Sequence, residues 1–257
     1  MKNEAFKERD SSYAEGALSI NAVFDSGSRE IKEIFIASGA KVEDINIHRI
    51  IVKAKQLNIP VNCCSDEFYE EHSTAKTGGG ILAEVSDRKL YSLEELLLKQ
   101  HKLIFLLSGI EDPYNFGYSV RSLYASGAGG MLLPPRSWMS AAGVCIRASA
   151  GATELIDCAG YTDEKELVFA LKSNGYSIVC AAEVKNSVSL YKAEISFPCV
   201  LIIGGEKRGI SKALIENADN IIRIPYGRSF NKSLTTSAAS AVIGFEFMRR
   251  FNGYSQK

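Results

Sequence analysis

The sequence predicts an α/β protein with a mostly parallel sheet in its C-terminal part and a smaller α/β domain before it. From Lys102 onward, short apolar runs typical of buried parallel strands alternate with helix candidates of about 8 to 12 residues. A shorter series of the same kind precedes Lys102. Apolar residues make up 46% of the 257 residues, enough for a sizeable core. Such alternation predicts helices on both faces of the sheet.

The first domain is expected over residues 1–95. Residues 1–15 are polar and are expected to form a helical arm. The elements that follow cover residues 18–24 (helix), 31–37 (strand), 42–57 (helix), 59–63 (strand), 81–85 (strand) and 87–98 (helix). Three consecutive glycines, Gly78 to Gly80, precede the last of these strands. They lack the Gly-Lys-Ser/Thr ending of a phosphate-binding loop and open no helix, so we interpret them as a turn.

The second domain is expected over residues 100–257. Its strand candidates cover residues 103–107, 130–133, 155–158, 178–182, 200–203 and 221–224. The clearest amphipathic helix covers residues 164–173, and Gly175 would end it. The last helix, over residues 237–250, has small residues that would permit close helix packing, namely Ala238, Ala241 and Gly244.

Polar and glycine-rich loops follow three of these strands. Asn115 and Arg121 come after the first strand of the second domain, and Glu206 lies in the glycine-rich turn after the strand at 200–203. The third loop follows the strand at 221–224 and leads into the last helix. Ligands of open α/β sheets bind beyond the carboxyl ends of the strands. We therefore expect the three loops to form one composite pocket.

The loops carry three motifs in order along roughly residues 100 to 250: Asn115-x-Gly117-x-x-x-Arg121, Gly204-Gly205-Glu206-x-x-Gly209-x-Ser211, and Ile224-Pro225 followed by Ser233-Leu234. The set resembles the motifs of the SpoU (TrmH-type) branch of the SPOUT RNA methyltransferases, and Ser149 to Ala152 resembles a further family segment. The resemblance implies a trefoil knot near residues 204–241, S-adenosylmethionine as cofactor, and methyl transfer to a ribose 2′-hydroxyl of ribosomal or transfer RNA. It also implies a homodimer and an N-terminal domain that binds the RNA substrate.

A cofactor with a sulfonium cation, an adenine ring and an amino-acid end suits a pocket of backbone groups and apolar walls. A ligand approaches the backbone most closely where side chains are absent. We assign to the cofactor the strand-end residues of this character, which are Ala182, Gly204, Gly205, Ile224, Pro225, Ser233 and Leu234. No Gly-x-Gly-x-x-Gly follows the first strand of the second domain, which argues against a Rossmann dinucleotide site.

The resemblance gives a catalytic role to Arg121, with Asn115, Glu206 and Thr235 beside it. A guanidinium keeps its proton at neutral pH. We therefore expect Arg121 to stabilise the developing alkoxide and to bind phosphate rather than to act as a base. Asn115 and Glu206 would restrain Arg121 by hydrogen bonds and opposite charge. Thr235 stands where members of the family usually carry Asn, and threonine cannot offer the paired donors of an amide.

The net charge of the chain is zero, which argues against a histone-like binder. Residues 1–100 carry 13 basic and 17 acidic residues, and residues 101–257 carry 17 basic and 13 acidic ones. Candidates for RNA contacts in or near the motif loops are Arg136, Trp138, Arg147, Lys207, Arg208, Arg228 and Lys232. Taken singly, each charge is more typical of a solvated surface.

Two other functions fit the same residues. One is a base-directed methyltransferase of the wider SPOUT class. The other is a catalytically silent RNA-binding protein of the same fold, which Thr235 favours. Single residues also have ordinary explanations, since Gly204-Gly205 can form a plain strand-to-helix turn and Glu206 can cap a helix beginning near Gly209.

The sequence contains no apolar run of about 18 residues or more and begins with a charged, polar stretch. We therefore expect a cytoplasmic protein without a membrane segment. The six cysteines form no Cys-x-x-Cys pair, and we interpret them as reduced structural thiols. Cys63-Cys64 has no further ligand at the spacing of a zinc site, so no metal is expected.

Overall fold

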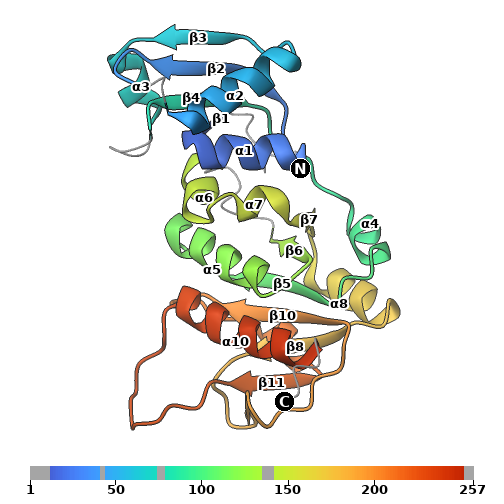
Figure 1. Ribbon diagram of the computed structural model, residues 1–257. Coiled ribbons are helices and arrows are strands. Elements are labelled where there is room, and N and C mark those ends of the chain that lie inside the picture. Colours follow the sequence, from blue (N-terminus) through green and yellow to red (C-terminus); the bar gives the residue numbers. More distant parts are fainter. Residues whose placement is uncertain (1–11, 41–43, 74–78, 135–141, 252–257) are drawn as a thin grey trace, which may run out of the picture. The chain divides into compact units, whose positions relative to one another are not determined.

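The computed structural model describes residues 12–40, 44–73, 79–134 and 142–251. The chain divides into two compact units (Figure 1). The first comprises Met1–Lys89 and Trp138–Leu155, and the second comprises Leu90–Ser137 and Ile156–Lys257. The sequence alone places residues 138–155 in the second domain, whereas the helices of this segment pack within the first unit.

The first unit is a mixed α/β unit. Its elements are β1 (Ser12–Glu15), α1 (Gly16–Ser26), β2 (Ile31–Ala37), α2 (Ile45–Gln56), β3 (Val61–Cys64), α3 (Asp66–His72), β4 (Ile81–Val85), α6 (Ala142–Ala148) and α7 (Ala152–Leu155). The strands form one sheet in the order β1-β4-β2-β3, with β4 antiparallel to both neighbours and β3 parallel to β2. Ile20 of α1, Ile34 of β2 and Ile50 of α2 are fully buried in one core.

Two elements of the first unit differ from the prediction. Ser12–Glu15 form a strand, not the helix expected over residues 1–15, of which residues 1–11 lie outside the described part. The reason is long-range pairing, because all four residues pair with β4. Helix α3 is absent from the predicted elements, although Ser65 is a good N-cap whose hydroxyl accepts the Phe68 N–H.

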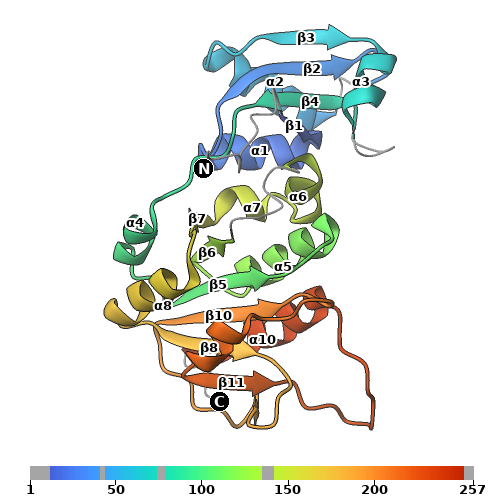
Figure 2. The same cartoon turned by 180° about the vertical axis from the view of Figure 1, so that it is seen from behind.

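The second unit contains a seven-stranded sheet in which all neighbouring strands are parallel. Its helices are α4 (Leu93–Leu98), α5 (Pro113–Ala125), α8 (Glu164–Ser173), α9 (Lys212–Glu216) and α10 (Thr236–Phe251). In sheet order its strands are β7 (Asp157–Gly160), β6 (Gly130–Leu133), β5 (Leu103–Ser108), β10 (Cys199–Gly204), β8 (Ser177–Ala181), β11 (Asn220–Arg223) and β9 (Val188–Ser189). Figure 2 shows β5, β10, β8 and β11 side by side.

Two elements of the second unit have boundaries that differ from the prediction by two residues or more. The helix expected over residues 87–98 begins only at Leu93, because Ser92 and Glu95 form a capping box at that point. The strand expected over residues 155–158 begins at Asp157, because Leu155 ends helix α7.

The apolar runs that predicted parallel strands are buried. Leu103 to Leu107 and Cys199 to Ile203 lie at the centre of the sheet and are almost inaccessible to solvent. On α10, Gly244 permits the close packing expected there, because a Cβ at this position would lie 2.6 Å from Ser126 Oγ at the end of α5. The predicted fold class, a mostly parallel C-terminal sheet with a smaller N-terminal α/β domain, is confirmed. The trefoil knot stays a prediction.

Four of the cysteines, Cys145, Cys158, Cys180 and Cys199, are buried. Burial raises the pKa of Cys180 and Cys199 to about 12. Both are therefore protonated and unreactive, as structural thiols are. In the ranges that the structure covers, no helix has both the length and the apolar character needed to cross a membrane.

Candidate active site

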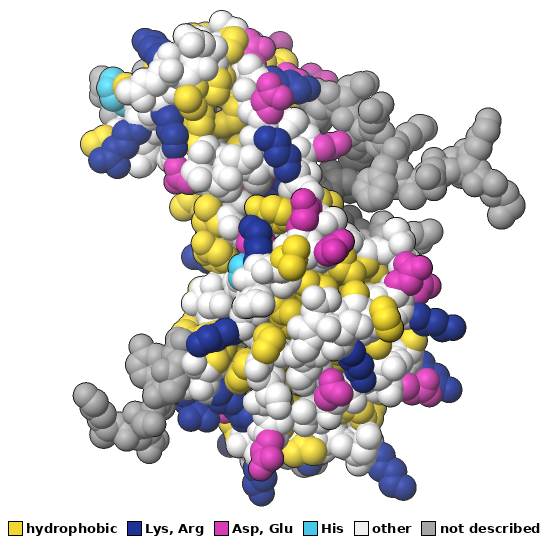
Figure 3. Space-filling view, turned by 90° about the vertical axis from the view of Figure 1, so that its right-hand side faces the viewer, with side chains coloured by type: hydrophobic (Ala, Val, Ile, Leu, Met, Phe, Trp, Pro, Cys, Tyr) yellow, Lys and Arg dark blue, Asp and Glu magenta, His cyan; other side chains and the backbone are white. Residues whose placement is uncertain are grey.

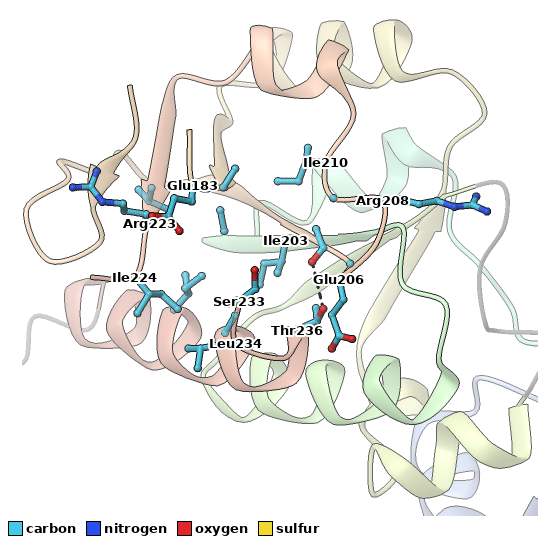
Figure 4. A pocket seen from close by; sticks show the side chains of 18 of the residues that line it. Glu183, Ile203, Glu206, Arg208, Ile210, Arg223, Ile224, Ser233, Leu234 and Thr236 are labelled. Carbon is cyan, nitrogen blue, oxygen red and sulfur yellow. Dashed lines mark hydrogen bonds between the residues drawn. The ribbon is translucent and has the colours of Figure 1, made fainter. Parts of the chain in front are cut away.

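A pocket of about 450 Å³ opens at the carboxyl ends of three parallel strands of the second unit (Figure 4). The ends of β8, β10 and β11 and the first turns of α10 contribute its walls. The lining residues are Ala181 to Glu183, Ile203 to Ile210, Ile222 to Ile224, Tyr226, Ser233, Leu234, Thr236, Ala239 and Ile243. Loops of the second and third motifs thus meet at one edge of the sheet, as the strand order requires.

Two glycines allow the loops after β5 and β10 to pack backbone against backbone. Gly205 donates its N–H to the Ser108 carbonyl at 2.6 Å, and Gly209 donates to the Gly205 carbonyl at 3.0 Å. A Cβ on Gly205 would lie 2.2 Å from the Gly109 carbonyl oxygen, and one on Gly204 would lie 2.8 Å from Gly209. Because backbone occupies these places, no side chain larger than hydrogen fits without moving a loop.

The pocket combines apolar walls with backbone edges. Ile203, Ile210 and Ile222 are buried and line the pocket. The Thr236 hydroxyl donates to the Gly204 carbonyl at 3.4 Å, which joins the start of α10 to the end of β10 (Figure 4). An apolar wall beside exposed peptide groups fits an adenine nucleoside, since a flat ring needs both contact area and edge hydrogen bonds.

Two contacts within the loop of the third motif hold it together. Leu234 donates its N–H to the Tyr226 hydroxyl at 3.1 Å, and the rings of Tyr226 and Phe230 lie 6.1 Å apart. Both aromatic side chains are exposed. The loop therefore presents apolar surface toward solvent next to the pocket.

Most of the residues assigned to the cofactor from the sequence lie together. Ala182, Gly204, Gly205, Ile224, Ser233 and Leu234 line the pocket, and Pro225 is not among its lining residues. Other lining residues were not predicted, and they include Glu183, Arg223, Tyr226 and Thr236. Glu183 could have been found by extending the predicted strand at 178–182 by one residue, and Arg223 lies inside the predicted strand at 221–224, next to the assigned residue Ile224.

Thr235 has a structural role that the sequence did not indicate. It precedes α10, and its hydroxyl accepts the Ala238 N–H at 3.3 Å while its carbonyl accepts the Ala239 N–H at 3.0 Å. These are the bonds of an N-cap, a position where Asn, Ser and Thr are all favoured. Replacing the usual Asn by Thr therefore preserves the helix start, and Thr235 itself does not line the pocket.

Asn115 and Arg121 lie on α5 and are not lining residues of this pocket. The Asn115 N–H donates to the Asp112 carboxylate at 3.1 Å in the helix cap, and its side chain is half-buried. Arg121 is exposed. Within the described part of one chain, no hydrogen bond or ion pair joins Arg121 to Asn115 or Glu206. Glu206 lines the pocket, and helix α9 is capped by Ser211 instead, so Glu206 is not its cap.

The residues expected to contact RNA are dispersed. Arg208 lines the pocket, Arg228 and Lys232 lie exposed in the third-motif loop, and Arg147 lies on α6 of the first unit, 3.9 Å from Glu15. Arg136 and Trp138 lie outside the described residues. On the face drawn in Figure 3, the described Lys and Arg side chains are scattered among acidic ones and form no continuous basic patch.

A family model described as the SpoU rRNA Methylase family matches residues 102–245, more than half of the chain. The chain belongs to the SpoU family. The resemblance predicted from the three motifs is thus confirmed, and with it the class of RNA methyltransferase. The family segment contains the whole pocket described above.

Curated SpoU relatives extend over most of the chain. One is the 23S rRNA (guanosine-2′-O-)-methyltransferase RlmB of Haemophilus influenzae, 24% identical over 239 residues that cover 91% of this chain and 96% of the relative. Another, from Staphylococcus saprophyticus, is named as a TrmH family tRNA/rRNA methyltransferase. It is 30% identical over 174 residues, which cover 68% of this chain and 69% of the relative.

Solved structures of methyltransferases share the fold. An AdoMet-bound rRNA methyltransferase from Sinorhizobium meliloti superposes with a TM-score of 0.77 at 22% identity and covers 94% of this chain and 87% of its own. The SpoU methyltransferase AviRb from Streptomyces viridochromogenes, in complex with AdoMet, gives a TM-score of 0.78 at 17% identity and covers 97% and 96%. AdoMet is S-adenosylmethionine, the cofactor that the sequence predicts.

Proposed function

We propose that this chain transfers a methyl group from S-adenosylmethionine to a ribose 2′-hydroxyl of ribosomal RNA, acting in the cytoplasm as a homodimer. The pocket lined by residues of the second and third motifs carries the proposal. Membership of the SpoU family and relatives named as 23S rRNA 2′-O-methyltransferases support it.

The residues of the pocket fit the cofactor. Gly204 and Gly205 leave peptide groups uncovered, and Ile224 and Leu234 supply apolar contact. When bound there, S-adenosylmethionine supplies an electrophilic methyl group on a sulfonium centre. The surrounding loops would fix the orientation of the bound cofactor, and holding two reactants in line accelerates a transfer between them.

Arg121 belongs to an exposed stripe on α5. Tyr114, Tyr118 and Arg121 follow the helical spacing of one face and are all exposed. Helix α10, which packs beside α5, exposes Val242 and Phe245. Exposed apolar side chains on two neighbouring helices are typical of a subunit interface. A second copy covering these helices would place Arg121 within a dimer interface, from which it can reach the partner's pocket.

In that arrangement the chemistry is divided between two chains. The attacking 2′-hydroxyl must lose its proton as the bond forms, and the Arg121 guanidinium would stabilise the resulting alkoxide. Glu206, at the pocket, would hold the arriving guanidinium by opposite charge. The Asp112 carboxylate, which accepts the Asn115 N–H, holds the first turn of α5, and the half-buried Asn115 amide would restrain Arg121 by a hydrogen bond. Arg147, Arg228 and Lys232 would contact RNA phosphates, with residues 1–95 as the substrate-binding domain.

Methylation of ribosomal RNA with isotope-labelled S-adenosylmethionine tests the proposal. We expect incorporation into ribosomal RNA, recovery of the label in 2′-O-methylated nucleosides after digestion, and loss of incorporation in Arg121→Ala. Lys212→Ala is the matched control, because Lys212 is an exposed cation of α9 that does not line the pocket. Label on a base instead would identify a base-directed enzyme, and RNA binding without incorporation would identify a silent binder.

A mixed-dimer experiment tests the division between two chains. Arg121→Ala and Glu206→Gln are each expected to be inactive alone. If Arg121 of one copy serves the pocket of the other, a mixed dimer holds one intact site, so random mixing restores about a quarter of the sites. Mixtures without activity, made from chains shown to exchange, would place Arg121 and Glu206 in the same site of a single chain.

A further inference from the structure

Glu111 joins the first motif loop to the second by two ion pairs. Its Oε2 accepts a hydrogen bond from Lys207 Nζ at 2.8 Å, and its Oε1 lies 3.3 Å from Arg208 Nε. Each carboxylate oxygen therefore faces one cation. The hydrogen bond from Lys207, followed by the charges of Lys207 and Arg208, lowers the pKa of Glu111, and the same hydrogen bond raises the pKa of Lys207.

The two cations stand on a fixed turn at the pocket. Gly205 and Gly209, which flank them, are held by the backbone hydrogen bonds of the loop crossing. A Cβ added to Gly109 would lie 3.1 Å from Arg208 Cβ, so the base of the Arg208 side chain rests against the first loop. Both cations line the pocket, and Figure 4 shows the Arg208 side chain extending away from the other labelled residues.

An exposed carboxylate bound in this way is replaceable. The side chains of Lys207, Arg208 and Glu111 are 78%, 71% and 42% exposed. Ion pairs of such exposure contribute little to stability, so breaking them costs little. Two cations that each face one oxygen of an anion also match the two non-bridging oxygens of an RNA phosphate.

We propose that Lys207 and Arg208 form a binding site for a backbone phosphate next to the ribose to be methylated, and that Glu111 occupies this site until RNA displaces it. The inference rests on the proposed function, because it names how RNA reaches the same pocket. A phosphate within a polyanion displaces a single carboxylate because binding also releases counterions from the RNA. Glu111 thus masks the only two cations of the second motif loop, residues 204–211, all of which the structure describes.

The experiment compares Glu111→Gln with Glu216→Gln. Glu216 pairs with Lys212 on α9 at 3.5 Å, is 61% exposed and does not line the pocket, so its substitution makes the same change in net charge elsewhere. The probe is a fluorescein-labelled RNA hairpin, and its affinity is measured by anisotropy over a range of salt concentrations. We expect Glu111→Gln to bind about two- to five-fold more tightly at low salt and Glu216→Gln to bind as the wild type does.

A double-mutant cycle distinguishes two ways in which Glu111 could weaken RNA binding: by masking Lys207 and Arg208, or by repelling the RNA directly. In a Lys207→Gln/Arg208→Gln background, the hairpin should bind more weakly, with a slope of log affinity against log salt reduced by about one. If Glu111 acts by masking the pair, Glu111→Gln gains nothing in this background. If the gain persists there, Glu111 repels RNA through space and the proposal is wrong.

Elution from heparin-agarose provides a readout that requires no RNA recognition. Glu111→Gln should elute at higher salt than Glu216→Gln, because the unmasked pair also binds sulfate groups. If no variant binds the hairpin but Glu111→Gln still elutes from heparin at higher salt than Glu216→Gln, the proposed function is wrong and the masked site is not. Equal behaviour of the two variants on both probes would overturn the masked site.

Discussion

The two units hold distant segments of the chain in place by opposite means. In the first unit, helix α7 is joined to the end of α1 through buried charges, since Glu154 accepts hydrogen bonds from Ser28 Oγ at 2.6 Å and Arg29 Nε at 2.9 Å. In the second unit, the loops after β5 and β10 contact each other through their backbones at Gly205, and the charged groups of Glu111 and Lys207 are exposed to solvent. Buried charges depend on each partner, whereas exposed ones exchange readily.

This contrast indicates a division of roles between the two sets of charges. The side chains of Arg29 and Glu154 are 1% and 0% exposed, so no ligand can compete for them. The segment from Ser149 to Ala152, which resembles a family motif, lies beside this cluster in the first unit, and a Cβ on Gly151 would lie 2.4 Å from Ala22 Cβ. Gly151 thus lets this segment pack closely against α1, whereas the exposed charges of the second unit can exchange partners.

Breaking the buried cluster should have the largest effect. Glu154→Gln leaves the Arg29 guanidinium buried without its counter-charge, and we expect a loss of about 3–5 kcal/mol in the free energy of unfolding. Urea denaturation of the full chain measures this loss. Hydrogen exchange in residues 142–155 should rise at the same time, because this segment loses its attachment.

Two further sets of variants test whether burial explains the loss of stability in Glu154→Gln. Arg88 Nε also lies 3.7 Å from Glu154 Oε2. Arg29→Met and Arg88→Met combined with Glu154→Gln therefore remove all three charges and should recover a substantial part of the loss. Glu216→Gln, which breaks an exposed pair of the second unit, should change stability by no more than about 0.5 kcal/mol. Equal losses from the buried and exposed pairs would show that burial does not distinguish them.

The second largest effect is expected from adding a methyl group at Gly205, where the loops after β5 and β10 cross. A Cβ on Gly205 would lie 2.2 Å from the Gly109 carbonyl oxygen, so Gly205→Ala must separate the two loops that form the pocket. We expect S-adenosylmethionine to bind about ten-fold more weakly or worse, which corresponds to about 1.4 kcal/mol, as measured by calorimetry. Gly160→Ala is the matched control, because a Cβ at Gly160 has nothing within 4 Å. Unchanged affinity in Gly205→Ala would show that the crossing does not shape the cofactor site.

The sequence predicted these two regions unequally, for a physical reason. The unbroken apolar run of Leu103 to Leu107 signals a buried parallel strand by itself, and glycine-rich loops at strand ends signal a ligand site, so the pocket was largely predictable. Strand β1 was not, because Ser12–Glu15 become a strand only by pairing with β4, about 70 residues away. The burial of Glu154 likewise depends on Arg29, a partner that local pattern cannot reveal.

The position of Arg121 illustrates the same limit at the site. Its spacing from Asn115 places it on a helix at the ligand edge, yet the structure leaves it exposed on α5, outside the pocket of its own chain. Motif order along a chain does not specify whether two motifs meet within one molecule or between two. The mixed-dimer experiment is therefore the measurement that relates the first motif to the other two.

A smaller effect than at Gly205 is expected at Thr235, where two substitutions distinguish helix capping from catalysis. Thr235→Ala removes the acceptor of the Ala238 N–H and should cost about 1 kcal/mol in the free energy of unfolding, measured by urea denaturation. Thr235→Asn should restore the stability, because Asn caps helices at least as well as Thr. If threonine serves only as a cap, methyl transfer by Thr235→Asn will equal that of the wild type. A large gain in transfer with unchanged stability would instead mean that the family's usual amide contacts substrate or cofactor, and that its absence here limits the reaction.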